Sequence, residues 1–453
     1  MNAEILTIGD ELLRGEIVDS NKSVLSERLL ALDIDTHFHA SVRDDPADMR
    51  DAFLRAASRA DVVLVSGGLG PTRDDLTTEV LAASFGLELR RDAAALAEIR
   101  AFFAGVGREM APNNAKQADF PEGAEVLPNP IGTAPGFCLR VPRAAATGGS
   151  RRGSAEVWFF CMPGVPRELL RMLDEQVLPR LAQRQEREGG GADGVMRAAL
   201  LRTFGIGESS LDAALQDLAR EPGVVLGFRT SFPENLLRPL VRATSADDAA
   251  QRLAALCAQI RERLGPLVYG EGEEGLPAVV GRLLRERGRT LALAESCTGG
   301  SIAELVTQVP GSSDYFLGSA VVYADAAKRE LLGVPAALLE KYGAVSEQVA
   351  RAMAEGIRRR LGADYAVAAT GISGPGGGSD EKPVGLVHLA LASAERTHSE
   401  HFVFPLDRAR HRALTAWTAL DWVRRALIGA PLEGPSLVRR PAGAGTGSAP
   451  GSR

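Results

Sequence analysis

The order of apolar and amphipathic segments constrains this chain more than any other feature. Between residues 1 and 180, short apolar or β-branched runs alternate with amphipathic stretches, and the alternation returns between residues 275 and 428. This pattern is typical of a mainly parallel sheet covered by helices, in which the loops at the carboxyl ends of the strands converge on one edge. Two α/β domains are therefore predicted.

Within the first domain the pattern predicts individual elements. Strands are expected at residues 3–9, 35–42 and 60–68, helices at 21–32 and 46–60, and two paired later strands at 136–141 and 156–164. The small, polar residues 143–155 between that pair are expected to form a solvated insertion.

A length of 453 residues exceeds what one hydrophobic core usually organises, so several domains are expected. The predicted boundaries are 1–182, 195–272, 275–428 and 429–453. The charged, glycine-rich run at 183–194 is interpreted as a linker. The second domain has the predicted order β-α-β-β-α-β of a split βαβ module, with no titratable cluster, which favours a spacer or dimerisation role. The last segment is rich in Gly, Pro, Ala and Ser and is predicted to be a disordered tail.

Composition excludes several classes of protein. The chain has 52 Lys and Arg against 58 Asp and Glu, a net charge of −6, which argues against direct nucleic-acid contact through a large basic face. The sequence shows no long apolar span and no signal-peptide pattern at its start, so a cytoplasmic location without a membrane partner is expected. Its four cysteines are far apart and are expected to be reduced.

Glycines and carboxylates gather at predicted strand ends of the first domain. The segments are residues 9–15 (GDELLRG), 44–45 (DD) and 66–77 (SGGLGPTRDDLT), supported by 129–136 (NPIGTAPG). Glycine N–H groups in the third segment can approach a phosphate closely, and Asp74, Asp75 and Glu79 are suited to a hard cation. The simpler alternative is a tight glycine turn in which Asp74 or Asp75 caps the next helix.

These segments resemble a known family. SGGLGPTRDDLT is similar to the SGG(x)GPTxDDxT loop of the molybdopterin-binding fold, and TIGDELLRGEIVDSN is similar to the opening of the CinA (competence/damage-inducible protein A) family. The resemblance implies a three-layer domain that, in some members, cleaves ADP-ribose with a divalent metal ion, here expected to be Mg²⁺ or Mn²⁺. The implied site, with Asp45 and Asp75 as metal ligands, comprises Asp10, Glu11, Asp45, Gly67, Gly68, Gly70, Asp74, Asp75 and Thr77.

In the second α/β domain, Ser296 lies on a predicted strand-to-helix turn in the run ESCTGG. Such a turn exposes a hydroxyl at the sheet edge, and the helix N-terminus beyond it favours negative charge. A serine nucleophile needs a base. The chain has no histidine between His39 and His388, so a Ser-His-Asp triad has no obvious member.

Lys328 is the alternative base. It lies in the first turn of a predicted helix, and Tyr323 lies at the end of the preceding apolar strand. A desolvated ammonium group loses its proton more readily and can then serve a serine. Equally compatible with the sequence are a solvated Lys328 and a core Tyr323. Cys297 is a rival nucleophile, ranked below Ser296 because no histidine partner is in view.

A glycine-rich loop and two arginines complete this candidate site. The loop TGISGPGGG at 370–378 can turn backbone N–H groups and the hydroxyls of Thr370 and Ser373 toward an anion, unless it is only a connection between strands. Arg408 and Arg412 share one face of a predicted helix and suit a phosphate or a surface carboxylate.

These segments also resemble the CinA family, whose C-terminal domain is a nicotinamide mononucleotide (NMN) deamidase. AESCTGG, Y(x)4K, GAVSE and TGISGPGGGSDEKPVG all match, so the resemblance spans residues 1–428 and makes the middle domain KH-like. It implies an amidohydrolase without a cofactor, in which Ser296 attacks the carboxamide, Lys328 accepts the proton and Tyr323 assists. The implied substrate-binding residues are Thr298, Gly299, Gly300, Thr370, Gly371, Ser373, Gly374, Arg408 and Arg412.

The sequence leaves two other functions open. One is a molybdopterin- or pterin-binding protein that uses the N-terminal loop, against which the serine motif argues. The other is a competence-related interaction protein without catalysis, although the negative charge and the lack of aromatic-basic interleaving argue against DNA contact. The leading interpretation is an NMN amidohydrolase in pyridine nucleotide recycling, whose N-terminal domain is a candidate ADP-ribose pyrophosphatase. A homodimer is expected, because small α/β domains often complete a crevice with a neighbour.

Overall fold

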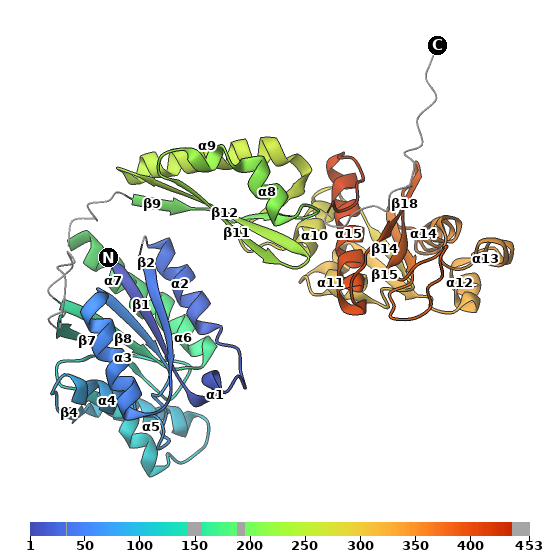
Figure 1. Cartoon of the computed structure of the whole chain (residues 1–453). Coiled ribbons are helices and arrows are strands. Elements are labelled where there is room, and N and C mark those ends of the chain that lie inside the picture. Colours follow the sequence, from blue (N-terminus) through green and yellow to red (C-terminus); the bar gives the residue numbers. More distant parts are fainter. Residues whose placement is uncertain (33, 144–155, 188–194, 437–453) are drawn as a thin grey trace. The chain divides into compact units, whose positions relative to one another are not determined.

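Two compact units make up the structure, a computed structural model (Figure 1). The residues it describes are 1–32, 34–143, 156–187 and 195–436. The first unit holds residues 1–197 with 243–246, and the second holds 198–242 with the residues from 247 onward. Nearly all of the predicted insertion at 143–155 lies outside the described residues.

The first unit is built on a six-stranded sheet in the order β2-β1-β3-β8-β7-β6. Its strands are β1 (Asn2–Ile8), β2 (Asp35–Val42), β3 (Val62–Ser66), β6 (Glu125–Leu127), β7 (Gly136–Pro142) and β8 (Glu156–Met162). The first four in the order are parallel neighbours, whereas β7 is antiparallel to both β8 and β6. Residues 128–135 between β6 and β7 are too few for the helical crossover that a parallel pair needs. A separate antiparallel pair is formed by β4 (Leu89–Arg91) and β5 (Asp119–Pro121).

Helices cover both faces of this sheet and give three layers, as expected. They are α1 (Asp10–Leu13), α2 (Asn21–Ala31), α3 (Pro46–Arg59), α4 (Thr77–Ser84), α5 (Ala93–Gly105), α6 (Pro166–Met172) and α7 (Leu178–Arg187). Apolar residues of α3, α4 and α5 join one buried cluster, and those of α2, α6 and α7 join another. Alternate residues of β3 divide between the two clusters, because successive strand side chains point to opposite faces.

Helix α7 extends into the segment predicted as a linker. Leu181 is buried in the core. Arg184 is 3% exposed, donates to the Asp61 carbonyl at 3.0 Å and lies over the Trp158 ring at 4.8 Å. The linker prediction was therefore wrong for residues 183–187, which continue helix α7. The charged residues that suggested a linker include Arg184, whose side chain is buried. Residues 188–194 lie outside the described residues.

The middle domain combines an antiparallel sheet with two helices. Its central elements are β10 (Leu201–Thr203), α8 (Glu208–Leu215), β11 (Val224–Ser231), β12 (Glu234–Ala243), α9 (Ala246–Leu264) and β13 (Val268–Glu271). The strands follow the order β11-β12-β10-β13, and β11 and β12 form a hairpin that turns at Phe232 and Pro233. The predicted order of elements is confirmed, except that the first expected strand is divided into β9 (Val195–Ala198) and β10.

A buried polar cluster lies next to the turn of this hairpin, although the sequence predicted no titratable cluster in the domain. Arg202 donates to the Glu234 carboxylate at 2.8 Å, and the Tyr269 hydroxyl donates to the same carboxylate. The side chains of Arg202 and Glu234 are 12% and 10% exposed. The sequence prediction was wrong because these residues lie on three different strands, and only the sheet brings them together.

The C-terminal domain places a five-stranded sheet between two layers of helices. Across the sheet the strands are β15 (Phe316–Val321), β14 (Leu291–Glu295), β16 (Tyr365–Gly371), β17 (Leu386–Ala392) and β18 (Thr397–Val403). The first three are parallel and the last two antiparallel. One face carries α10 (Leu276–Glu286), α11 (Ser301–Thr307) and α15 (Arg408–Ile428), and the other α12 (Asp325–Leu332), α13 (Ala336–Tyr342) and α14 (Glu347–Leu361). Among the described helices, none has both the length and the apolar content needed to cross a membrane.

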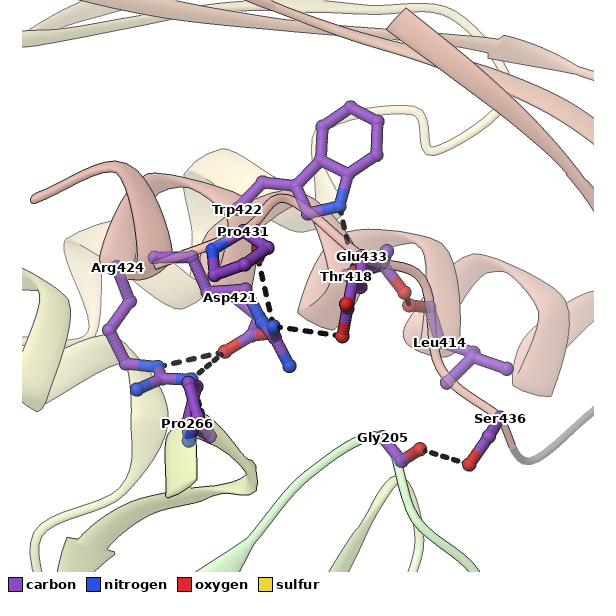
Figure 2. A network of polar contacts seen from close by, with 11 residues as sticks. Gly205, Pro266, Leu414, Thr418, Asp421, Trp422, Arg424, Pro431, Glu433 and Ser436 are labelled. Atoms are coloured by element: carbon purple, nitrogen blue, oxygen red, sulfur yellow. Dashed lines mark hydrogen bonds and ion pairs between the residues drawn. The ribbon is translucent and has the colours of Figure 1, made fainter. Parts of the chain in front are cut away.

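The residues that follow α15 pack against the domain. Trp422 Nε1 donates to the Glu433 carbonyl at 3.1 Å, and the Ser436 N–H donates to the Gly205 carbonyl at 2.8 Å (Figure 2). Gly434 lies so close to the Phe402 ring that a Cβ would clash with it. The prediction of disorder from residue 429 was therefore wrong for residues 430–436. These residues pack on the folded domain, and amino-acid composition cannot predict such a contact. Residues 437–453 lie outside the described residues.

Candidate active site

The candidate site of the C-terminal domain lies where three parallel strands end. The Ser296 N–H, just beyond β14, donates to the Ala369 carbonyl of β16 at 2.9 Å. The Val322 N–H, just beyond β15, donates to the Glu295 carbonyl at 2.8 Å. These bonds place the Ser296 turn beside the ends of both neighbouring strands. Tyr323 is the second residue after β15, so it shares this edge with Ser296.

Ser296 is held in a tight turn and is 8% exposed. Its carbonyl accepts the Gly299 N–H at 3.1 Å. Gly299 and Gly300 have φ values of +59° and +97°, which a residue with a side chain rarely adopts. The two glycines of ESCTGG are therefore required to turn the chain from β14 into α11.

The carboxylate of Glu295 occupies the N-terminus of α11. Glu295 is fully buried and accepts the N–H groups of Gly300 at 2.9 Å, Ile302 at 3.1 Å and Ala303 at 2.9 Å. The predicted preference of this helix terminus for negative charge is met by the protein's own Glu295 carboxylate, which satisfies these donors in place of an attacking oxygen or a ligand. No role was predicted for Glu295. Its signal in the sequence was an acidic residue closing an apolar strand.

Lys328 is buried, which decides against the solvated alternative. Its side chain is 1% exposed, and Nζ donates to the Tyr323 carbonyl at 3.0 Å and lies 3.6 Å from Asp325 Oδ1. Burial lowers the pKa of Lys328, against the opposing effect of Asp325. The Asp325 side chain is 58% exposed, so solvent weakens its hold on the ammonium group. Lys328 therefore loses its proton more readily than a surface lysine.

Tyr323 is exposed, not a core residue. It is 62% exposed, and its hydroxyl accepts a hydrogen bond from Arg408 Nη2 at 3.3 Å. Its backbone carbonyl is the acceptor for Lys328. Tyr323 therefore joins the candidate base to helix α15.

Cys297 is a core thiol. It belongs to the apolar cluster that includes α10, α11 and α15, and burial raises its pKa to about 12. The thiol is therefore protonated at neutral pH, which agrees with ranking it below Ser296.

His411, on α15, is fully buried with Nε2 3.1 Å from the Gly385 carbonyl.

The predicted hydroxyl donors fall into two groups. Thr298 and Ser373 are 0% and 5% exposed, and each has a hydroxyl without a partner among the described residues. An unsatisfied buried polar group costs about 1–3 kcal/mol, which a bound ligand would recover. Thr370 instead donates its hydroxyl to the Ala344 carbonyl at 2.9 Å and so holds the GAVSE segment.

Arg408 and Arg412 bind backbone groups of the site. Arg408 Nη1 donates to the Gly374 carbonyl at 2.8 Å. Arg412 donates to the Thr298 carbonyl through Nε at 3.0 Å and Nη2 at 2.7 Å, and Nη2 also donates to the Ser301 hydroxyl at 2.8 Å. The arginines thus attach the glycine-rich loop and the serine turn to α15. Phosphate binding by the two arginines stays a prediction. Substrate contact at Gly371 also stays a prediction; a Cβ at this position would lie 2.5 Å from the Leu386 carbonyl.

In the first unit, the loops after β1, β2 and β3 also meet. The Asp10 N–H donates to Asp44 Oδ2 at 2.9 Å. Burial raises the pKa of Asp44 against the opposing effect of the Asp10 N–H bond, and the nearby carboxylates of Glu11, Asp10 and Asp74 add to the rise. The structure therefore brings three of the predicted acidic residues together, with Asp44 beside them in place of its neighbour Asp45.

The two predicted metal ligands bond to nearby backbone. Asp45 caps α3, where its carboxylate accepts the Ala47 and Asp48 N–H groups at 2.9 and 3.1 Å. Asp75 Oδ2 accepts the Thr72 N–H at 2.9 Å. Helix α4 has no side-chain cap, so the alternative in which Asp74 or Asp75 caps this helix was wrong. Within the described residues, no group of three or more His, Cys, Asp or Glu side chains is arranged to hold a metal. The residues present do not form a ready metal centre, and Mg²⁺ or Mn²⁺ binding stays a prediction.

The glycine loop after β3 is closed from inside by Thr77. Gly67 and Gly68 have φ values of +109° and +69°, and a Cβ on Gly67 would clash with the Ile8 carbonyl. The buried Thr77 hydroxyl donates to the Gly67 carbonyl at 2.8 Å, and the Thr77 N–H donates to the Gly68 carbonyl at 3.1 Å. Thr77 therefore shapes the loop.

A small pocket of about 10 Å³ lies beside this loop, lined by Gly68, Gly70 and Asp75 together with Lys116. Lys116 comes from the 3-10 helix η1 (Pro112–Ala118), and its Nζ donates to the carbonyls of Thr72 at 2.6 Å and Asp75 at 2.8 Å. Sequence reasoning missed this cation, because no motif marks a lysine forty residues beyond the loop.

Three family models match the chain in succession. "Probable molybdopterin binding domain" matches residues 4–183, "Damage-inducible protein CinA KH domain" residues 199–270, and "CinA C-terminal domain" residues 273–427. The fold and these matches define a protein that joins a molybdopterin-binding fold, a KH-like domain and a CinA C-terminal domain.

Relatives match over nearly the whole chain. A CinA-like protein of Anaeromyxobacter sp. (strain Fw109-5) is 45% identical over 94% of this chain and 99% of its own length. A putative competence-damage inducible protein of Symbiobacterium thermophilum is 45% identical over 95% of this chain and 99% of its own. The solved structure of a competence/damage inducible protein from Agrobacterium tumefaciens is 42% identical and covers 34% of this chain and 94% of that chain, with a TM-score of 0.33. The chain belongs to the CinA family.

Proposed function

We propose that the C-terminal domain is an amidohydrolase that converts NMN to nicotinate mononucleotide and ammonia, in the recycling of pyridine nucleotides. The observation that carries the proposal is the buried Lys328, whose pKa is lowered by burial. It reaches the strand edge at which Ser296 follows β14. Family membership and the matching motifs support the same assignment.

The proposed reaction needs one nucleophile and one base. Ser296 Oγ attacks the carboxamide carbon, and its proton passes to the neutral amine of Lys328. The resulting ammonium returns the proton to the departing nitrogen, so ammonia leaves and a serine ester remains. Water then gives a proton to Lys328 and attacks the ester. The nicotinate product is released as Ser296 regains a proton.

Two features of the site support charge development during this reaction. The buried hydroxyls of Thr298 and Ser373 have no partner among the described residues, and each can donate to an oxyanion. The Tyr323 hydroxyl is held by Arg408, and the backbone carbonyl of the same residue accepts from Lys328, so Tyr323 can orient the substrate next to the base.

Ammonia release from NMN by the full chain, without added metal, tests the proposal. Ser296→Ala should reduce the rate by at least about a thousandfold and leave the melting temperature unchanged. Cys297→Ala is the matched control for a neighbouring residue and should retain activity. An active Ser296→Ala variant, or wild-type protein that releases no ammonia, would contradict the proposal.

For the N-terminal domain we propose a site for a nucleotide diphosphate, with ADP-ribose as the substrate to test. The crowded carboxylates around Asp44 and the cation Lys116 beside the glycine loop favour this choice. ADP-ribose hydrolysis should require Mg²⁺ or Mn²⁺, fail in Asp44→Asn and be unaffected by Ser296→Ala. Co-purified pterin fluorescence without hydrolysis would instead favour a pterin-binding role.

A further inference from the structure

Helix α15 faces the candidate active site on one side and the middle domain on the other. Arg408 and Arg412 lie four residues apart on the side that reaches the serine turn and the glycine-rich loop. Arg410 lies between them and therefore points about 200° around the helix from Arg408. Its guanidinium group lies 5.1 Å from the ring centroid of Phe232, at the turn of the β11–β12 hairpin. The first turn of α15 is thus held from both sides.

The middle domain also contacts α15 along its length. Trp417 packs against Phe204 and Tyr269, with ring centroids 5.7 and 6.1 Å apart. Phe204 and Tyr269 belong to the same buried apolar cluster as the core residues of α15. The two domains therefore share part of one hydrophobic core.

Polar contacts hold the opposite end of the helix. Arg424 is buried, pairs with Asp421 and donates to the Pro266 carbonyl of the middle domain at 2.5 Å (Figure 2). The segment after α15 returns to the same domain, where Ser436 bonds to the Gly205 carbonyl. Contacts at the start, middle and end of α15 leave little freedom for the helix to move relative to the middle domain.

The hairpin that carries Phe232 is itself braced. Glu234 is the first residue after the turn and is buried between Arg202 and Tyr269. Tyr269 is the residue whose ring packs on Trp417. The buried cluster therefore ties the hairpin turn to the surface that packs against α15.

We propose that the middle domain is a positioning element for the amidohydrolase site, with Phe232 as its positioning residue. Phe232 contacts Arg410 and so fixes the position of the first turn of α15. In that position Arg408 bonds to the glycine-rich loop and Arg412 bonds to the serine turn. The expected effect on rate rests on the proposed amidohydrolase function. This role takes the place of the spacer or dimerisation role favoured by the sequence.

Phe232→Ala in the full chain tests the contact. Phe232 is 36% exposed at a surface turn, so its truncation opens no core cavity. A single cation–π contact is modest, so kcat for ammonia release from NMN should fall about two- to tenfold. The melting temperature should be unchanged, and hydrogen–deuterium exchange of segments 296–303 and 371–378 should become faster.

The matched control is Val225→Ala. Val225 is a 60% exposed apolar residue on the same hairpin, and its truncation should leave kcat and exchange as in the wild type. Arg410→Gln removes the other partner of the contact. If Phe232 acts through Arg410, the double variant should lose no more activity than either single variant.

Exchange separates this proposal from the proposed function. If wild-type protein releases no ammonia, the amidohydrolase assignment fails, while faster exchange in Phe232→Ala still supports the positioning role. Unchanged exchange in both segments overturns that role whatever the activity. Should Phe232→Ala unfold the hairpin, Arg410→Gln tests the same contact from α15, and unchanged exchange in that variant would equally overturn it.

Discussion

Asp421→Asn should destabilise the second unit strongly, because Asp421 balances two buried arginines. Its carboxylate accepts hydrogen bonds from Arg424 Nε at 2.8 Å and Arg425 Nε at 2.7 Å (Figure 2). The three side chains are at most 4% exposed, so solvent does not screen their charges.

The size of the loss follows from the partners that remain. Removing one partner of a buried ion pair costs about 3–5 kcal/mol, because the other charge is left uncompensated. Here Arg424 keeps its bond to the Pro266 carbonyl, and Arg425 keeps one to the Pro431 carbonyl at 2.9 Å. We therefore expect the lower limit, about 3 kcal/mol, or roughly a hundredfold change in the ratio of folded to unfolded molecules.

Urea unfolding followed by tryptophan fluorescence measures this loss. The chain has three tryptophans, and Trp158→Phe removes the one in the first unit. Trp417 and Trp422 then report on the second unit, which avoids treating the whole chain as one two-state system. The transition midpoint should fall while the dependence of the unfolding free energy on urea stays the same.

Glu433→Gln is the matched control. Glu433 lies 3.5 Å from Arg425, but its side chain is 67% exposed, so its loss should cost less than about 0.5 kcal/mol. A loss below about 1 kcal/mol in Asp421→Asn, or equal losses in the two variants, would refute the reasoning.

Three further predictions concern the candidate sites. Burial lowers the pKa of Lys328 below its ordinary value of 10.5, so at pH values between the two the unfolded chain binds more protons than the folded chain. The unfolding free energy of the second unit should therefore rise with pH in that range. Urea unfolding at several pH values should show this rise in the wild type and not in Lys328→Met, and a fall with pH would contradict the assignment. Iodoacetamide at neutral pH should modify Cys297 only after unfolding, because the thiol is buried with a pKa of about 12; mass spectrometry showing rapid labelling of the native protein would disprove this. Asp45→Ala should destabilise the first unit by about 1 kcal/mol through loss of the α3 cap and spare ADP-ribose hydrolysis, whereas Asp44→Asn should abolish hydrolysis; the reverse result would restore Asp45 as the ligand.

Local elements were accessible from the sequence. The strand predicted at 35–42 is β2 to the residue, and the predicted helix at 46–60 is α3 with one residue fewer. Apolar periodicity and proline act within a few residues, so they leave a readable signal. Motif spacing likewise placed Ser296 and Tyr323 at the ends of strands, and Lys328 in the first turn of the helix that follows Tyr323, because parallel strands deliver their loops to one edge.

Contacts between distant segments were not accessible in this way. The sequence did not show that Glu295 satisfies the N-terminus of α11, that Asp44 faces the other carboxylates, or that α15 binds the middle domain. Each depends on which side chain points toward a group from another element, and a shift of one residue reverses the answer.

The sequence by itself therefore determined the family and the order of strands and helices, and it marked the segments that are candidates for the chemistry. Only the tertiary structure decided the state of the groups within those segments. Lys328 became a candidate base through burial, while Cys297, next to Ser296, became a core thiol. The physical reason is that desolvation and hydrogen bonding set protonation and reactivity, and both come from neighbours that the fold, not the local sequence, supplies.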